Sequence, residues 1–240
     1  MSLSEPRPDG RQPHALRPIE IELGIQRYAA GSALIKWGNT HVLCSATVED
    51  KVPGHRLESG GGWISAEYAL LPGSTMTRAR RERGKVGGRT AEIQRLIARS
   101  LRAAVDLDAL GPRSIWIDCD VVQADGGTRC ASITGGYVAL CLALQKLVDA
   151  GKLGPEIMPE PLAAVSLGVR NGQVIADLNY IEDASADVDL NFVSSVTGVV
   201  EIQGTAEGRP FTRAELDGMI DAGTAACEQL FEIQRAALRR

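Results

Sequence analysis

A glycine-rich segment at residues 125–129, with the sequence DGGTR, has the composition of an anion site. It lies between a predicted strand end and a predicted helix start. Gly126 and Gly127 let the backbone approach a ligand closely, Thr128 adds a hydroxyl and Arg129 adds a guanidinium. The free N–H groups of a helix N-terminus also attract negative charge. The same residues would serve a simple glycine turn with an N-cap threonine and a surface arginine. A P-loop is excluded, because its G-x-x-x-x-G-K-[ST] pattern is absent.

An acidic cluster follows later in the chain, where Asp177, Asp183, Asp187 and Asp189 lie within thirteen residues. Strand alternation would send Asp187, Asp189 and Asn191 to one face. With Asp183 in the preceding turn, these carboxylates could hold Mg²⁺ or Mn²⁺, which favour oxygen ligands. The alternative is a solvated strand face.

A basic cluster occupies residues 78–89, RARRERGKVGGR, where six of twelve residues are Arg or Lys against 26 of 240 in the whole chain. The glycines Gly84, Gly87 and Gly88 predict a loop that could follow a phosphate backbone. Because the net charge of the chain is −4, nucleic-acid binding would depend on such a local cluster. A solvated loop is the alternative.

An anion pocket, a carboxylate metal site and an arginine-rich loop together suit phosphoryl transfer on a nucleic acid. The chain has three histidines, His14, His41 and His55, and none falls in a zinc-binding spacing or an evident catalytic triad. This favours a nucleophile that needs little activation. Inorganic phosphate is already anionic at neutral pH, whereas water would have to be deprotonated.

The elements that must position these residues can be outlined from the apolar pattern. Strands are predicted at residues 19–23, 32–38, 41–49 and 63–71, separated by turn signals as in antiparallel hairpins. Further strands are predicted at residues 114–122, 162–169, 173–180, 187–193 and 198–204.

Three helices are predicted between and after these strands. The first carries an apolar face from Ile93 to Val105 and ends near Gly111, and the second runs from about Thr128 to Val148. The last opens at Thr212 with a capping-box spacing to Glu215. The order of elements predicts an α+β fold in one domain over residues 1–240.

Composition places the chain among ordinary globular proteins, with 44% hydrophobic and 23% charged residues. We expect no apolar run of membrane-spanning length, no secretory signal, and therefore no membrane partner and a cytoplasmic location. Five cysteines without a C-x-x-C pair suggest reduced, buried thiols.

Long blocks of the sequence resemble the ribonuclease PH family of phosphate-dependent tRNA 3′-exoribonucleases. The matching blocks are DGR at 9–11, LRPI at 16–19, GNT at 38–40, GWISAEY at 62–68, GRTAEIQRLIARSLR at 88–102, IDCDVVQADGGTR at 117–129, SITGG at 132–136 and VEIQGTAE at 200–207. They extend over almost the whole chain.

The resemblance implies a ribosomal protein S5 domain 2-like fold and a homo-hexamer built as a trimer of dimers. It implies that inorganic phosphate attacks the 3′-terminal phosphodiester of a tRNA precursor, or of another structured RNA 3′ end, and releases a nucleoside 5′-diphosphate. One phosphate bond replaces another of similar energy, so the same site should also add nucleotides from diphosphates.

Carried over by position, the resemblance assigns phosphate binding to Arg89, Gly127, Thr128 and Arg129. It assigns catalysis and Mg²⁺ or Mn²⁺ binding to the pair Asp183 and Asp189. The RNA-binding arginines of the family correspond to Arg78, Arg80, Arg81 and Arg83.

Two positions depart from the family pattern. Gly73 stands where relatives often carry a basic residue, and Asn179 stands where many have aspartate. Two other functions stay open: a non-catalytic ring subunit that only threads RNA, and a hydrolytic metal nuclease that would release monophosphates.

Overall fold

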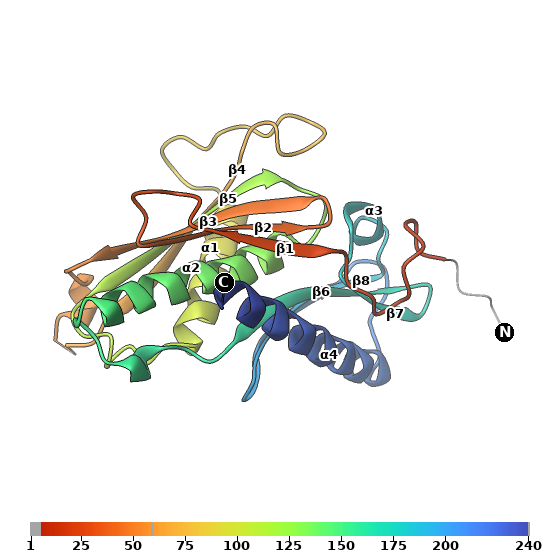
Figure 1. Cartoon of the computed structure of the whole chain (residues 1–240). Coiled ribbons are helices and arrows are strands. Elements are labelled where there is room, and N and C mark those ends of the chain that lie inside the picture. Colours follow the sequence, from red (N-terminus) through yellow and green to blue (C-terminus); the bar gives the residue numbers. More distant parts are fainter. Residues whose placement is uncertain (1–5, 59, 240) are drawn as a thin grey trace.

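Two β-sheets, with the helix α2 (Thr128–Asp149) packed between them, form the framework of the protein (Figure 1). A computed structural model describes residues 6–58 and 60–239. One sheet comes from the first half of the chain, and the other comes from the second half. The predicted α+β class is confirmed.

The first sheet has five strands in the order β1-β2-β3-β5-β4. Alternation puts one face of each strand into the core; Ile115, Ile117 and Cys119 of β5, for example, are buried. The strands are β1 (Ile19–Leu23), β2 (Gly31–Trp37), β3 (Thr40–Glu49), β4 (Trp63–Leu70) and β5 (Ser114–Gln123).

The order of this sheet corrects one prediction. The first three strands pair antiparallel as predicted, β1 with β2 and β2 with β3. The fourth strand, β4, does not continue them, because β5 lies between β3 and β4, antiparallel to β3 and parallel to β4. The helix α1 (Gly88–Ala103) makes the β4-to-β5 crossover and packs on β4. Its Ile93, Leu96 and Leu101 are buried as predicted.

The helix α1 ends earlier than predicted, at Ala103 and not near Gly111. The Asp106 side chain accepts hydrogen bonds from the backbone N–H groups of Asp108 and Ala109, at 2.9 and 3.1 Å. This local turn competes with continuation of the helix.

The second sheet has the order β7-β6-β8-β9. Its strands are β6 (Leu162–Arg170), β7 (Gln173–Ala176), β8 (Val188–Ser195) and β9 (Gly198–Ala206). The strand predicted over 173–180 stops at Ala176, because Asp177 adopts a left-handed conformation with φ of 58°. A one-turn helix missed by the sequence analysis, α3 (Tyr180–Asp183), follows.

The helix α2 (Thr128–Asp149) contacts β2 and β3 on one side and β6 on the other. Gly135 allows a close approach to β2 and β3, since a Cβ atom there would lie 2.8 Å from Ile35 Cγ2 and 2.9 Å from Cys44 Sγ. The sequence predicted no apolar run of membrane-spanning length, but α2 is long and apolar enough to cross a membrane by length and composition. Of the 18-residue stretch of α2 that meets this criterion, 78% is buried inside the protein. It is therefore the central core helix.

The last helix, α4 (Arg213–Leu238), covers β6 and β7. The predicted capping box is confirmed: Thr212 Oγ1 accepts from the Glu215 amide, and Glu215 accepts from the Thr212 amide. One continuous cluster of buried side chains includes residues of both sheets and of α1, α2 and α4. All five cysteines are free thiols buried within the protein.

Candidate active site

A cleft of about 470 Å³ lies where the N-termini of α1 and α2 face the second sheet. Residues from distant parts of the sequence line it, and most of the predicted site residues are among them. They are Arg80, Arg81 and Arg83 of the basic loop, Arg89 of α1, Gly126, Gly127, Thr128 and Arg129 of the glycine turn, and Asp183, Asp189 and Asn191 of the second half.

The glycine turn is built for close backbone contact. Gly126 and Gly127 have φ of 74° and 68°, in the left-handed region that favours glycine. A Cβ atom on Gly126 would lie 2.5 Å from the Leu178 carbonyl oxygen, so the turn packs directly against the chain that leads into α3. Gly127 is the N-cap of α2 and supplies no side-chain cap, so the first amides of α2 can bind an anion.

Two side chains of the first turn of α2 are already oriented. Thr128 Oγ1 lies 2.9 Å from the Tyr68 hydroxyl oxygen, within hydrogen-bond distance. Arg129 Nη2 donates to Glu92 Oε2 at 3.0 Å, and Gln203 Nε2 donates to Glu92 Oε1 at 2.8 Å.

The Arg129 side chain lines the cleft and is 19% exposed. Its Nε is buried and has no hydrogen-bond partner among the described residues. Burial raises the pKa of Glu92, but the hydrogen bonds from Gln203 and Arg129 outweigh burial and leave the pKa below its ordinary value. Glu92 therefore stays ionised and orients Arg129 by charge.

Asp183 and Asp189 form the acidic side of the cleft. Asp183 is the last residue of α3, and Asp189 lies near the start of β8. Burial, and next the negative charge of Asp183, raise the pKa of Asp189 to about 6, against the opposing effect of Arg129. Burial also raises the pKa of Asp183. Both carboxylates are therefore destabilised as anions until a cation or a proton neutralises them.

This pair fits a hard divalent cation. Mg²⁺ is commonly held by one or two carboxylates together with water and substrate phosphates. Within residues 6–58 and 60–239, no group of three or more His, Cys, Asp or Glu side chains forms a cage for a metal ion. A divalent cation held by these two aspartates would therefore need substrate oxygens and water as its other ligands.

The two other acidic residues of the predicted cluster do not line this cleft. The Asp177 carboxylate pairs with Arg17 and Arg11, at 2.7 and 3.0 Å. Asp187 precedes β8, and its carbonyl accepts a bond from the Glu207 amide at 2.9 Å. The alternation rule placed Asp187 and Asp189 on one face but could not show which position reaches the cleft.

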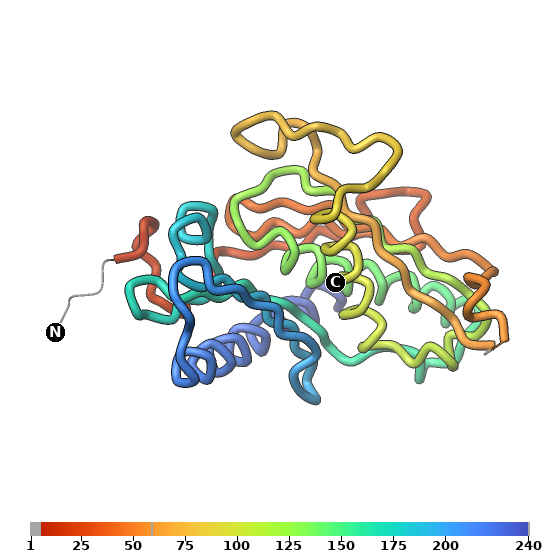
Figure 2. The backbone as a smooth tube through the Cα atoms, turned by 180° about the vertical axis from the view of Figure 1, so that it is seen from behind, coloured from red at the N-terminus to blue at the C-terminus, as the bar shows by residue number. Residues whose placement is uncertain are grey.

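The basic cluster forms a loop between β4 and α1 that projects above the first sheet (Figure 2). Arg80, Arg81 and Arg83 line the cleft, whereas Arg78 is exposed and does not. Gly73 lies in an exposed turn before this loop. Asn179 caps α3 by accepting from the Glu182 amide at 3.0 Å, a role that aspartate fills equally well.

Several residues of the site were missed by the sequence analysis. Glu92 and Tyr68 orient Arg129 and Thr128, and Arg17 contacts the glycine turn. Each of them lies in one of the sequence blocks that match the family. Membership of these blocks was the one sequence signal that could have indicated them. Their contacts are made across the sheets and could not be read from spacing.

Comparison with known proteins identifies relatives over nearly the whole chain. The profiles of the 3′ exoribonuclease family match, with domain 1 at residues 15–144 and domain 2 at residues 160–226. A ribonuclease PH of Crocosphaera subtropica is 52% identical over 98% of this chain and 99% of its own length. One of Mycolicibacterium gilvum is 56% identical over 97% of this chain and 91% of its own length.

Solved structures show the same fold at low sequence identity. Rice Rrp46 matches with a TM-score of 0.79 and 20% identity over 97% of this chain and 100% of its own. An Archaeoglobus fulgidus exosome with RNA bound to the active site matches with a TM-score of 0.78 and 24% identity over 95% of this chain and 92% of its own.

Proposed function

The chain belongs to the ribonuclease PH family of 3′ exoribonucleases, and from this we infer that it is a phosphorolytic 3′-to-5′ exoribonuclease that trims tRNA precursors. The observation that carries the proposal is that the glycine turn and the aspartate pair, far apart in sequence, line one cleft. An anion site next to a cation site is the arrangement that phosphoryl transfer requires.

We propose that inorganic phosphate binds between Arg89, the amides at Gly127 and Thr128, and the guanidinium of Arg129. The N-terminus of α2, at which Gly127 supplies no side-chain cap, and the presence of Arg89 and Arg129 in the lining of the cleft support this position. A phosphate oxygen then attacks the terminal phosphorus in line with the bond to the 3′ oxygen. That bond breaks, the nucleoside 5′-diphosphate leaves, and the shortened RNA keeps a 3′ hydroxyl.

The aspartate pair would act on the side of the leaving oxygen. Asp183 and Asp189 would hold Mg²⁺ or Mn²⁺, which supplies charge neutralisation on the phosphate oxygens when bound. Because burial raises the pKa of Asp189 to about 6, its carboxyl also exchanges a proton readily near neutral pH. In a second route, that proton would reach the leaving 3′ oxygen through water.

The RNA would enter past the basic loop. Arg80, Arg81 and Arg83 line the cleft and present charge to the last phosphates of the strand, while Arg78 would contact RNA further from the reacting bond. The substrates are then tRNA precursors and, beyond them, other structured RNA 3′ ends. In the reverse direction the same site would extend RNA from nucleoside diphosphates.

The assembly, domain and location are parts of the same proposal. A homo-hexamer built as a trimer of dimers would cover large apolar side chains outside the cleft, among them Tyr28 and Met76, which are 94% and 99% exposed. Residues 1–240 would act as one domain, which the continuous core supports. The five free thiols suit the reducing cytoplasm.

The test is to incubate the purified protein with Mg²⁺ and a tRNA that carries extra 3′ nucleotides, with and without inorganic phosphate. We expect nucleoside 5′-diphosphates to be released only when phosphate is present. Release of monophosphates without phosphate would identify a hydrolase. No release from a protein with a confirmed hexameric mass would identify the RNA-threading ring subunit, the alternative that the intact set of Arg89, Arg129, Asp183 and Asp189 disfavours.

A further inference from the structure

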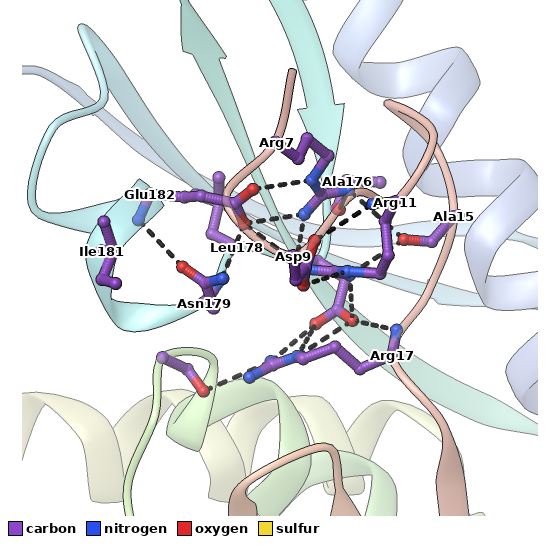
Figure 3. Close-up of polar contacts among 12 residues, drawn as sticks. Arg7, Asp9, Arg11, Ala15, Arg17, Ala176, Leu178, Asn179, Ile181 and Glu182 are labelled. Atoms are coloured by element: carbon purple, nitrogen blue, oxygen red, sulfur yellow. Dashed lines mark hydrogen bonds and ion pairs between the residues drawn. The ribbon is translucent and has the colours of Figure 1, made fainter. Parts of the chain in front are cut away.

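A buried ionic network joins the start of the chain to both sides of the cleft. Arg17 Nη2 donates to Asp177 Oδ1 at 2.7 Å and the Arg17 amide donates to Asp177 Oδ2 at 2.6 Å. Arg11 Nη1 donates to the same Asp177 oxygen at 3.0 Å. The side chains of Arg17 and Asp177 are 6% and 1% exposed, so these charges are paired away from water. Figure 3 shows Arg7, Arg11 and Arg17 of the N-terminal segment lying close together, with Glu182 beside Arg7.

Arg17 contacts the glycine turn with the rest of its guanidinium. Arg17 Nη1 donates to the Asp125 carbonyl oxygen at 2.5 Å, and Nη2 lies 3.5 Å from the Gly126 carbonyl oxygen. These carbonyls belong to the two residues just before Gly127, the N-cap of α2. One rigid guanidinium therefore links the turn to Asp177 in the second half of the chain.

The network also holds the helix that carries Asp183. Arg7 Nε and Nη2 donate to the two carboxylate oxygens of Glu182, each at 2.7 Å. Arg7 Nη2 and Arg11 Nη2 donate to the Asp177 carbonyl oxygen at 2.9 and 3.1 Å. Glu182 directly precedes Asp183, so the N-terminal segment is bonded to the glycine turn and to the carboxylate helix at once.

The conformation of Asp177 indicates that its position is constrained. Its φ of 58° is uncommon for a residue with a side chain, although Asp and Asn tolerate this region best. The conformation ends β7 and turns the carboxylate toward Arg17. A surface turn would need no such buried partner.

We propose that Arg17 and Asp177 are positioning residues for inorganic phosphate, an inference that rests on the proposed function. The pair holds the backbone at Asp125 and Gly126 so that the amides of Gly127 and Thr128 face the aspartate pair across the cleft. Neither residue is assigned a contact with phosphate. Their effect is on the placement of groups that bind phosphate, where a displacement of about 1 Å is costly.

A positioning role and a purely stabilising role for the Arg17–Asp177 pair predict changes in different quantities, the KM for phosphate and the melting temperature. A purely stabilising pair, when weakened, would lower the melting temperature and leave the kinetics of the folded enzyme intact. A positioning pair would raise KM for phosphate in the folded enzyme while KM for tRNA stays nearly constant.

Two variants with a control make the comparison. Asp177→Asn preserves side-chain volume and suits the left-handed backbone, but removes the charge that Arg17 pairs with. Arg17→Lys keeps the positive charge, but a lysine lacks the planar guanidinium whose several N–H groups bind Asp177 and the carbonyls of the turn at the same time. Arg209→Gln is the control, because Arg209 pairs with Glu215 at an exposed position outside the network and the cleft.

Steady-state kinetics would be measured with phosphate and extended tRNA varied separately, after assembly has been checked by light scattering. We expect KM for phosphate to rise about tenfold in Asp177→Asn and in the same direction in Arg17→Lys, with KM for tRNA within about twofold of the wild type. Arg209→Gln should match the wild type. If Asp177→Asn does not fold, the proposal is tested with Arg17→Lys alone, by whether KM for phosphate rises while KM for tRNA stays within about twofold.

Binding of inorganic phosphate alone, measured by calorimetry without RNA, separates this inference from the proposed function. A wild type that binds phosphate more tightly than both variants supports positioning even if no diphosphate is released. Folded variants with wild-type phosphate affinity, or with equal losses for phosphate and tRNA, would overturn the proposal.

Discussion

The Arg129 guanidinium is held in place by the protein itself, because Arg129 Nη2 donates to Glu92 Oε2 at 3.0 Å. Glu92 is in turn held by Gln203 from β9. This pairing fixes the guanidinium at the lining of the cleft. At the scale of single residues, the site depends on such paired side chains as much as on the groups that contact substrate.

Replacing Arg129 tests the phosphate assignment. We expect Arg129→Ala to weaken phosphate binding by about 10- to 150-fold, the equivalent of one charge-assisted hydrogen bond of about 1.5–3 kcal/mol. RNA binding without phosphate should persist. Arg129→Lys, which keeps the charge but loses the planar fork, should recover only part of the loss. A rate whose phosphate dependence is unchanged in Arg129→Ala would contradict the assignment.

Asp189 supplies the second test at this scale. Asp189→Asn keeps the shape but removes an oxygen anion, so kcat should fall at least about a hundredfold, because a bound Lewis acid contributes several kcal/mol. The variant should still assemble, as size-exclusion chromatography with light scattering would show. A hexamer of Asp189→Asn that degrades RNA at the wild-type rate would remove the catalytic role.

At the scale of elements, the glycine turn joins the start of α2 to the chain before α3. Asp125 Oδ1 accepts from the Tyr180 amide at 3.2 Å, and Gly126 packs against the backbone of Leu178 and Asn179. The glycine turn and the chain that leads into α3 therefore share a backbone contact. We expect a shift of one of them to displace the other.

Gly126→Ala should break that contact. Its Cβ would lie 2.5 Å from a carbonyl oxygen, and its φ of 74° is unfavourable for alanine by about 1 kcal/mol. We expect a lower melting temperature and a large loss of phosphate-dependent activity. Gly73→Ala is the matched control, because no atom of the described residues lies within 4 Å of its Cβ position. Equal melting temperatures and equal phosphate-dependent activities of the two variants would show that the contact between Gly126 and the Leu178 backbone does not matter for the site.

Asp118, on the outer face of the first sheet, leads to a prediction about the pH dependence of the melting temperature. Burial, then Glu67 and Asp120, raise the pKa of Asp118 above its ordinary value. The ionised form is therefore penalised in the folded protein, and the penalty is complete above the folded pKa and absent below the unfolded pKa. Asp118→Asn should raise Tm at pH 7 by roughly 1–3 °C, and the difference should vanish as pH falls below about 4.

Thermal unfolding at several pH values checks this expectation. Glu58→Gln, on an exposed loop, serves as the control. A difference between Asp118→Asn and wild type that grows as the pH falls would have the wrong sign and would refute the argument.

At the scale of the whole molecule, an acidic protein must bind an acidic polymer. The net charge is −4, yet three arginines of one loop line the cleft. Five arginines and four carboxylates line the cleft in all, so basic side chains are locally in slight excess although the chain as a whole is acidic.

Replacing Arg80, Arg81 and Arg83 by Gln should weaken tRNA binding and flatten its salt dependence. Each lost contact to a single strand reduces the slope of log K against log salt by about 0.7, so three contacts reduce it by about 2. Arg213→Gln, on the far helix α4, is the control. Identical slopes in the triple variant and the wild type would make the loop a solvated surface.

The sequence by itself determined the elements and the chemical groups. Strand alternation, helical periodicity and the Thr212 cap predicted nearly every strand and helix, because these signals act over a few residues. The DGGTR turn, Asp183 and Asp189 were predicted as a phosphate and metal site, and the structure places them in one cleft, while their roles stay predictions.

Only the tertiary structure decided how these parts are combined. It inserted β5 between β3 and β4, because strand order depends on pairing between distant segments. It separated Asp177 from Asp189, although both are carboxylates in one acidic run, because the left-handed turn at Asp177 directs it toward Arg17. Residue type determines which charge is present, but the path of the folded chain determines its partner.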